Sequence, residues 1–186
     1  MKKVLWIFGD SFSFYKNKAS WPNLLTASIH VNNYSTNGSS EYRIWKSYLQ
    51  HKSKISSNDL VLFCHTSPSR IYLKNDVLSI SRKLSSHLHC DILLNNVFAN
   101  NETKFINLLS TIWDEEYFND MYSLLVSKMV GIPNSIHVTF FEIKEKSVHN
   151  FHTLWNDNIG NINHLSVDGN VKVKNKLLEL INEAIN

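Results

Sequence analysis

The 186-residue sequence predicts an α/β fold in which helices cover both faces of a parallel sheet. Short apolar segments alternate along the chain with longer segments whose apolar residues recur at helical spacing. The three best apolar segments run directly into polar turns, as strands do at the carboxyl edge of a parallel sheet. No repeat, low-complexity tract or Pro/Gly-rich linker interrupts this alternation. We therefore expect one domain over residues 1–186.

Four segments predict strands of this sheet. The first, 4–8, is apolar and stops at a glycine, which indicates a buried strand delivered into a turn. The clearest internal strand is 59–64, and the last strong one is 136–143. A shorter strand is expected over 30–34, between the first strand and the polar turn that precedes the next helix.

The helices follow from apolar spacing and from capping residues. A short helix is expected to open at Trp21-Pro22 and to run to about residue 29. Ser39 or Ser40 can cap the next helix. The remaining polar segment, 144–163, is predicted to be loop. The expected helices after the first cover 41–51, 75–89, 102–130 with a break near 114–116, and 167–185.

Composition excludes several classes of protein. The net charge is +3, and the lysines are dispersed rather than gathered into the basic stripe typical of nucleic-acid binding. The apolar run 4–8 is shorter than the roughly 7–15 residues of a signal-peptide core. No segment reaches the ~20 apolar residues of a membrane span. Cys64 and Cys90 each lie in or beside an apolar stretch, which predicts buried free thiols rather than a disulfide or a zinc site. We expect a soluble, cytoplasmic protein without a membrane span, a metal or a nucleic-acid partner.

Ser11 is the first candidate for chemistry, because Gly9-Asp10-Ser11 follows the first strand at the edge where α/β sheets bind ligands. A serine is a weak nucleophile until a base removes its proton. His164 lies near the other end of the chain, just before the final helix, where a loop would present it. The pair predicts an activated serine.

Four blocks of the chain, taken in order, resemble the SGNH/GDSL hydrolase family. They are Gly-Asp-Ser after the first strand, a Gly-Ser turn after the second, a polar turn after the third, and a late His followed by a helix; together they span residues 5–175. Residues 37–44 and 66–70 are similar to a subgroup found in tailed phages and environmental bacteria, whose third block is a Thr-Ser-x-x-Arg turn. The resemblance implies the SGNH hydrolase fold, a three-layer α/β/α arrangement with a flavodoxin-like parallel sheet.

The resemblance also implies roles for individual residues. Ser11 would be the nucleophile and would offer its backbone N–H to the oxyanion. Gly38 would give a second backbone N–H. His164 would be the general base and then the acid for the leaving alcohol, and Asp10 would be a supporting carboxylate. No metal or organic cofactor is expected for this chemistry.

Two positions depart from the family pattern. Thr66 stands where the family has the asparagine that completes the oxyanion hole, and losing one such donor costs about 100–1,000-fold in rate. Asn161 stands where the family has the aspartate that orients the histidine, and in serine proteases that exchange costs ~10⁴-fold. Asp157 or Asp168, or a backbone carbonyl, could orient the histidine instead.

Further candidates for substrate binding lie near the same turns. Arg43 and Arg70 follow two of the turns and could bind an anionic group, or form structural ion pairs. His65 ends the third strand and could line the pocket, or be a satisfied structural histidine. The complete set of substrate-binding candidates is Asp10, Asn37, His65, Arg43, Arg70 and Trp155.

The sequence therefore predicts a serine ester hydrolase acting on a small-molecule or carbohydrate ester, with a sugar acetate as the first expectation by analogy. The alternative is a catalytically weak or inactive binding or structural protein of the same fold, associated with a virion. A nucleotide-binding domain ranks last, because the turn after the first strand has a single glycine and an acid facing the would-be phosphate.

Overall fold

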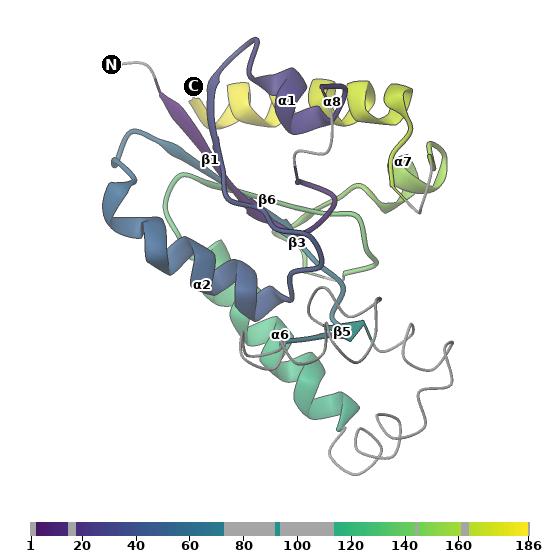
Figure 1. Cartoon of the computed structure of the whole chain (residues 1–186). Helices are drawn as coiled ribbons and strands as arrows, with labels where there is room; N and C mark the ends of the chain where they lie inside the picture. Colours follow the sequence, from purple (N-terminus) through teal and green to yellow (C-terminus); the bar gives the residue numbers. More distant parts are fainter. Residues whose placement is uncertain are drawn as a thin grey trace, which may run out of the picture.

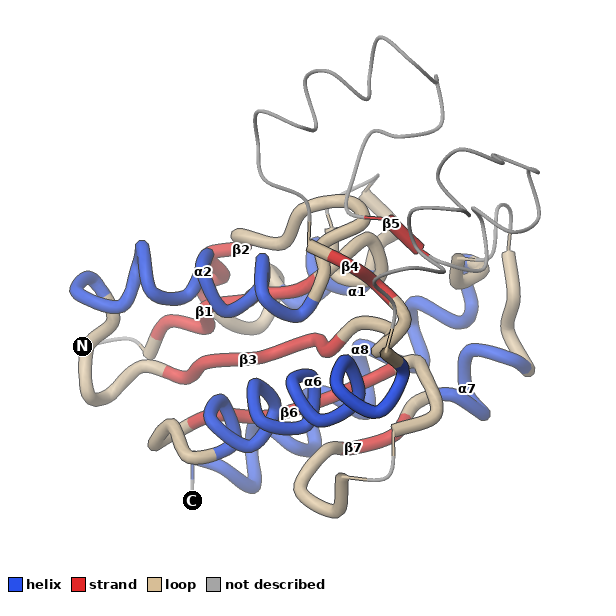
Figure 2. Tube along the Cα trace, turned by 90° about the horizontal axis from the view of Figure 1, so that it is seen from below, coloured by secondary structure: helices blue, strands red, loops and turns tan. Residues whose placement is uncertain are grey.

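A five-stranded parallel sheet lies between two helical layers in the computed structural model, which describes residues 3–14, 18–72, 92–93, 114–143, 145–160 and 164–185. Figure 1 shows helices above and below the sheet, and Figure 2 shows its strands side by side. The order is β2-β1-β3-β6-β7. The strands are β1 Val4–Gly9, β2 His30–Asn33, β3 Leu60–His65, β6 Ser135–Thr139 and β7 His149–Asn150.

The strand order reverses at β1, which pairs with β2 on one side and with β3 on the other. This order is one of the common arrangements of doubly wound sheets. In such sheets a crevice opens beyond the carboxyl ends of the two strands at the reversal point. Here that crevice lies between the residues that follow β1 and those that follow β3.

One face of the sheet is covered by α1 (Trp21–Leu25) and α8 (Val167–Ile185). Because side chains alternate along a strand, Leu5 and Ile7 of β1 point to this face. Both are fully buried against these helices. The α8 residues that close this core are Val173, Leu177, Leu180 and Ile181.

The opposite face is covered by α2 (Glu41–His51) and α6 (Glu115–Val130). Trp6 and Phe8 of β1 point to it, as their alternate positions require. Phe8 stacks on Phe63 of β3, with ring centroids 5.9 Å apart. Ile44, Tyr48 and Met129 complete this second core.

The predicted strands 4–8, 30–34 and 59–64 and the helices 41–51 and 167–185 are confirmed within one residue at each end. Ser40 is the cap of α2, since its hydroxyl accepts a hydrogen bond from the N–H of Arg43. Asp114 caps α6 in the same way, so the break predicted near 114–116 is the start of that helix. The expected helix 75–89 and residues 102–113 lie outside the described residues.

Other expectations were wrong in extent. The first helix ends at Leu25 rather than near 29, and β6 ends at Thr139 rather than at 143. The predicted loop 144–163 contains β7 and the short helix α7 (His152–Asn156). A two-residue strand and a five-residue helix are too short to show a period in the sequence. Two further short strands, β4 (Arg70–Ile71) and β5 (Ile92–Leu93), pair antiparallel beside the main sheet.

Candidate active site

Ser11 lies at the tip of the turn that follows β1. The main-chain carbonyl of Asp10 accepts hydrogen bonds from the N–H and the hydroxyl of Ser13, both at 3.2 Å. The Asp10 carboxylate accepts a third from the N–H of Phe12, at 2.9 Å. These bonds close a tight turn around Ser11, which stays partly exposed. The turn therefore presents Ser11 at the crevice of the sheet.

Gly9 allows this turn to sit directly against β3. It pairs with Cys64 in the strand register. A Cβ atom at Gly9 would lie 2.7 Å from the Cβ of Cys64, a distance that side chains do not tolerate. Cys64 is a buried free thiol, as predicted, and burial raises the pKa of that thiol well above its usual value. Cys90 lies outside the described residues.

The Gly38 turn is tied to the same end of β1. The N–H of Thr36 donates to the carbonyl of Gly9 at 3.1 Å, and the N–H of Ser39 donates back to the carbonyl of Thr36 at 3.3 Å. Gly38 has φ of 63°, in the left-handed region where a side chain is strained. Asn37 beside it is exposed. The first and second sequence blocks are thus joined by a direct hydrogen bond.

His164 reaches this edge from the opposite end of the chain. Just before α8, Ile159 and Leu165 form an antiparallel β-bridge. The N–H of Gly160 also donates to the carbonyl of His164 at 2.5 Å. The His164 ring then lies 5.3 Å from the ring of Phe12, the residue after Ser11. Asn161, the expected partner of His164, lies outside the described residues.

An aromatic cluster holds Phe12 in this position. The Phe12 ring stacks on Phe140 at 4.8 Å and meets the edge of Trp155 at 5.6 Å. Its main-chain carbonyl accepts a hydrogen bond from the Trp21 indole at 2.8 Å. Trp155, a candidate for substrate binding, is a partly buried member of this cluster. It supports the turn that carries Ser11.

Thr66 follows β3 and is bonded entirely to the interior of the protein. Its hydroxyl donates its only proton to the Asp10 carboxylate at 2.9 Å, and its side chain is fully buried. Its N–H donates to Glu41 at 3.2 Å, and its carbonyl accepts from the Tyr122 hydroxyl at 2.9 Å. In this arrangement Thr66 fixes Asp10, and its hydroxyl proton is not directed toward an oxyanion.

Burial raises the pKa of Asp10 above its ordinary value. The positive charge of Arg70 opposes the rise, as do the hydrogen bonds from the Phe12 N–H and the Thr66 hydroxyl. Asp10 has no exposed surface. It therefore acts as a buried brace between the turns after β1 and β3.

A chain of buried polar side chains continues from this brace across the sheet. Glu41 Oε1 lies 2.6 Å from His65 Nδ1, and His65 Nε2 lies 3.0 Å from His137 Nδ1. The far nitrogen of His137 lies 2.7 Å from the Ser135 hydroxyl oxygen. His65, a candidate for lining the pocket, is fully buried and has a partner at both ring nitrogens. The structure thus agrees with the reading of a satisfied structural histidine.

The directions of these hydrogen bonds can be worked out from Ser135, the last side chain of the buried polar series. The Ser135 hydroxyl donates to the carbonyl of Ile132 at 2.6 Å, so its oxygen accepts from His137 Nε2–H. His137 Nδ1 then accepts from His65 Nε2–H. One proton remains, held between His65 Nδ1 and Glu41. Burial lowers the pKa of His137 to about 3, and the neighbouring charges of His65 and His149 act in the same direction, which keeps this ring neutral.

Sequence reasoning missed Glu41, His137 and Tyr122 as parts of the site. Glu41 is the first residue of a helix, where a carboxylate is ordinary. Tyr122 has helical apolar spacing, which predicts only a core residue, and it does lie in the core. Of the three, only His137 could have been identified from the sequence, because a polar residue inside an apolar strand needs a buried hydrogen-bond partner.

The two arginines follow the second and third turns, Arg43 in the first turn of α2 and Arg70 in β4. The Arg43 guanidinium lies 4.9 Å from the centre of the Tyr72 ring. Arg70, in β4, lines a pocket with Ser40 and Tyr72 and contributes positive charge near Asp10. Both are partly buried. The structure thus places the charge of Arg70 close enough to the crevice to act on Asp10.

No family model matches the chain, and no curated protein matches its sequence. Among the residues that the structure describes, no helix is long and apolar enough to cross a membrane. Across those same ranges, no three His, Cys, Asp or Glu side chains are grouped so that they could hold a metal ion.

Proposed function

We propose that this chain is a serine ester hydrolase that works through an acyl-enzyme on Ser11. One observation carries the proposal: the turns bearing Ser11 and Gly38 are joined at the end of β1, and His164 returns to the same place across Phe12. The order of the blocks and their place at the reversal point support the same function.

The proposed reaction needs no group beyond the chain and water. Ser11 Oγ attacks the carbonyl carbon of the ester while His164 accepts the hydroxyl proton. The N–H groups of Ser11 and Gly38 stabilise the negative charge on the carbonyl oxygen. The alkoxide leaves with the proton from His164, and the acyl group remains on Ser11. Water, deprotonated by His164, then releases the carboxylic acid and restores the serine.

The test is labelling with a fluorophosphonate, read by intact mass, with turnover of 4-nitrophenyl acetate measured beside it. The expected result is one adduct on the wild type and none on Ser11→Ala or His164→Ala. Ser67→Ala is the matched control, because Ser67 is a partly exposed serine of the neighbouring turn, and it should label like the wild type. Labelling that persists in Ser11→Ala, or no labelling of any variant, would refute the proposal.

One observation favours a second function, a binding or structural protein with little or no turnover. The Thr66 hydroxyl is bonded to Asp10, so the third oxyanion donor of the family is missing from the crevice. Such a loss costs about 100–1,000-fold in rate where it has been measured in other enzymes. This function predicts no adduct on Ser11 in the labelling experiment.

A further inference from the structure

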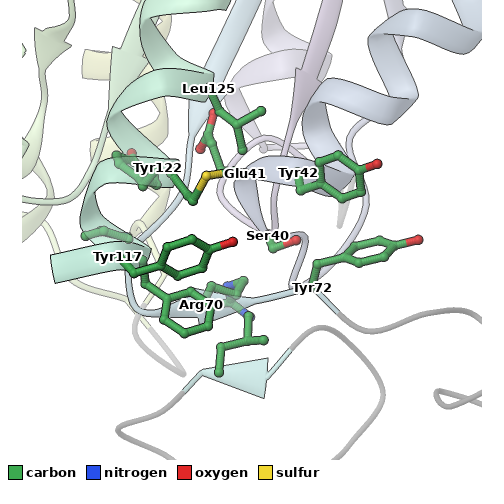
Figure 3. Close-up of a pocket in the computed structure, with 12 residues that line it drawn as sticks. Ser40, Glu41, Tyr42, Arg70, Tyr72, Tyr117, Tyr122 and Leu125 are labelled. Atoms are coloured by element: carbon green, nitrogen blue, oxygen red, sulfur yellow. The ribbon is translucent and has the colours of Figure 1, made fainter. Parts of the chain in front are cut away.

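A pocket of about 170 Å³ lies beside the Gly38 turn. The first residues of α2 form one wall, the first turns of α6 another, and β4 with Tyr72 a third. Figure 3 shows tyrosine side chains on several sides of it, with Arg70 among them. Ser40, two residues after Gly38, lines it directly. The pocket is therefore next to the turn that we propose for the oxyanion.

The size of the pocket fits one six-membered ring. An apolar cavity of about 150 Å³ engineered into another protein is large enough to bind benzene. The walls here are mainly aromatic and aliphatic, the surfaces against which a ring packs. The apolar lining includes Tyr72, Tyr117, Phe118, Met121, Tyr122 and Leu125.

Two polar side chains of the inner walls, Tyr122 and Glu41, are already bonded to the protein. The Tyr122 hydroxyl donates to the carbonyl of Thr66. Both oxygens of Glu41 are hydrogen-bonded inside the core, where Oε2 accepts from the Thr66 N–H and Oε1 shares a proton with His65 Nδ1. The Tyr72 hydroxyl accepts from the Lys46 ammonium at 3.0 Å. A sugar ring would bring several hydroxyls that need partners when they leave water. An aromatic ring has no hydroxyls of its own and would need only the faces and edges of the surrounding side chains to pack against.

We infer that this pocket binds the aromatic ring of an ester substrate, an inference that rests on the proposed hydrolase function. Arg70, which lines the pocket, adds to the preference for an aromatic ring, because the positive charge of a guanidinium is attracted to the face of such a ring. The substrate class becomes an aryl-bearing ester, in place of the sugar acetate expected from the sequence.

The test separates ring binding from turnover by using the Ser11→Ala variant. Its binding of 4-fluorobenzyl alcohol, which is not an ester, is followed by fluorine NMR. Saturable binding is expected. Met121→Trp, which fills the pocket, should lower the affinity for the probe at least tenfold. Leu124→Trp is the matched control, since Leu124 is 62% exposed on the same helix and does not line the pocket; it should change affinity less than twofold.

Three results would overturn the inference: no saturation by the probe, equal affinity in Met121→Trp, or displacement of the probe by methyl glucoside at a similar concentration. Should Met121→Trp fail to fold, Tyr117→Ala removes a half-exposed side chain from the pocket wall and should lower the affinity for the probe at least threefold. Failure of the hydrolase proposal is seen separately, as loss of Ser11 labelling in the wild type. Saturable binding without that labelling would refute the hydrolase and keep the ring pocket.

Discussion

The crevice at the end of β1 and β3 is held from two sides by different kinds of interaction. On the Phe12 side, the Phe12 ring in the turn after β1 packs against Phe140 just after β6, against Trp155 of α7 and against His164. On the Thr66 side, a buried hydrogen-bonded chain runs from Asp10 through Thr66 and Glu41 to the histidines of β3 and β6.

The difference matters because the two supports respond differently to change. The hydrophobic effect that buries these rings is non-directional, so after the loss of one ring its neighbours can shift partly into the space. Hydrogen bonds in the interior are directional, and a donor left without an acceptor keeps its full desolvation penalty. We therefore expect the polar side to be the more sensitive to substitution. Three predictions test this comparison.

The largest effect is expected for Glu41→Ala. It removes the acceptor of the Thr66 N–H and the partner of His65 Nδ1, both buried. The free energy of unfolding should fall by about 3–5 kcal/mol, measured by urea denaturation. Glu41→Gln is the control: its oxygen can accept from the Thr66 N–H and its amide can donate to His65 Nδ1, so the free energy of unfolding should fall by only about 1 kcal/mol. An equal loss in both variants would contradict the hydrogen-bond assignment.

A smaller effect is expected for Phe12→Ala. A buried phenylalanine replaced by alanine costs about 3–5 kcal/mol, and Phe12 is only partly buried, so we expect about 2–4 kcal/mol. Turnover should fall as well, because His164 loses the ring beside it. Phe12→Leu, which keeps most of the apolar contact, should recover more than half of the stability. If Phe12→Ala costs more than Glu41→Ala, the polar side is not the more sensitive one.

The smallest effect is the pH dependence that His137 contributes. Its pKa in the folded protein is lowered to about 3, so between 6.5 and 3 the unfolded chain binds the proton and the folded chain does not. The contribution to stability is present above about pH 6.5 and is lost as the pH falls through this window. We expect a loss of about 2 kcal/mol between pH 6 and 4.5. His137→Gln should lack this component, and identical pH profiles would exclude it.

Much of this arrangement follows from local sequence. Apolar runs at 4–8 and 59–64 predict buried strands, and Ser40 before a helical period predicts the start of α2; the structure confirms each. The order of these elements predicts a parallel sheet with helices on both faces. Since carboxyl ends of parallel strands meet at one edge, the sequence also brings the residues after β1, β2 and β3 to that edge.

The sequence did not predict which side chains share protons inside the protein. Glu41, His65 and His137 are separated by 24 and 72 residues along their two contacts, and no periodicity relates them. For Thr66 the sequence led to a role that differs from the hydrogen bonding seen in the fold. The resemblance to the SGNH/GDSL family implied an oxyanion donor at this position, while the fold turns the Thr66 hydroxyl to Asp10, which is buried and needs donors.

The sequence by itself determined the sheet, its two helical layers and the edge to which the polar turns belong, because strand and helix periods and turn residues act over a few neighbours. Only the tertiary structure decided how that edge is built: Phe12 among aromatic rings, Thr66 bonded inward, and a tyrosine-lined pocket next to Gly38. The physical reason is that burial and hydrogen-bond partners depend on residues far apart in the chain, which meet only when the strands are paired and the helices packed.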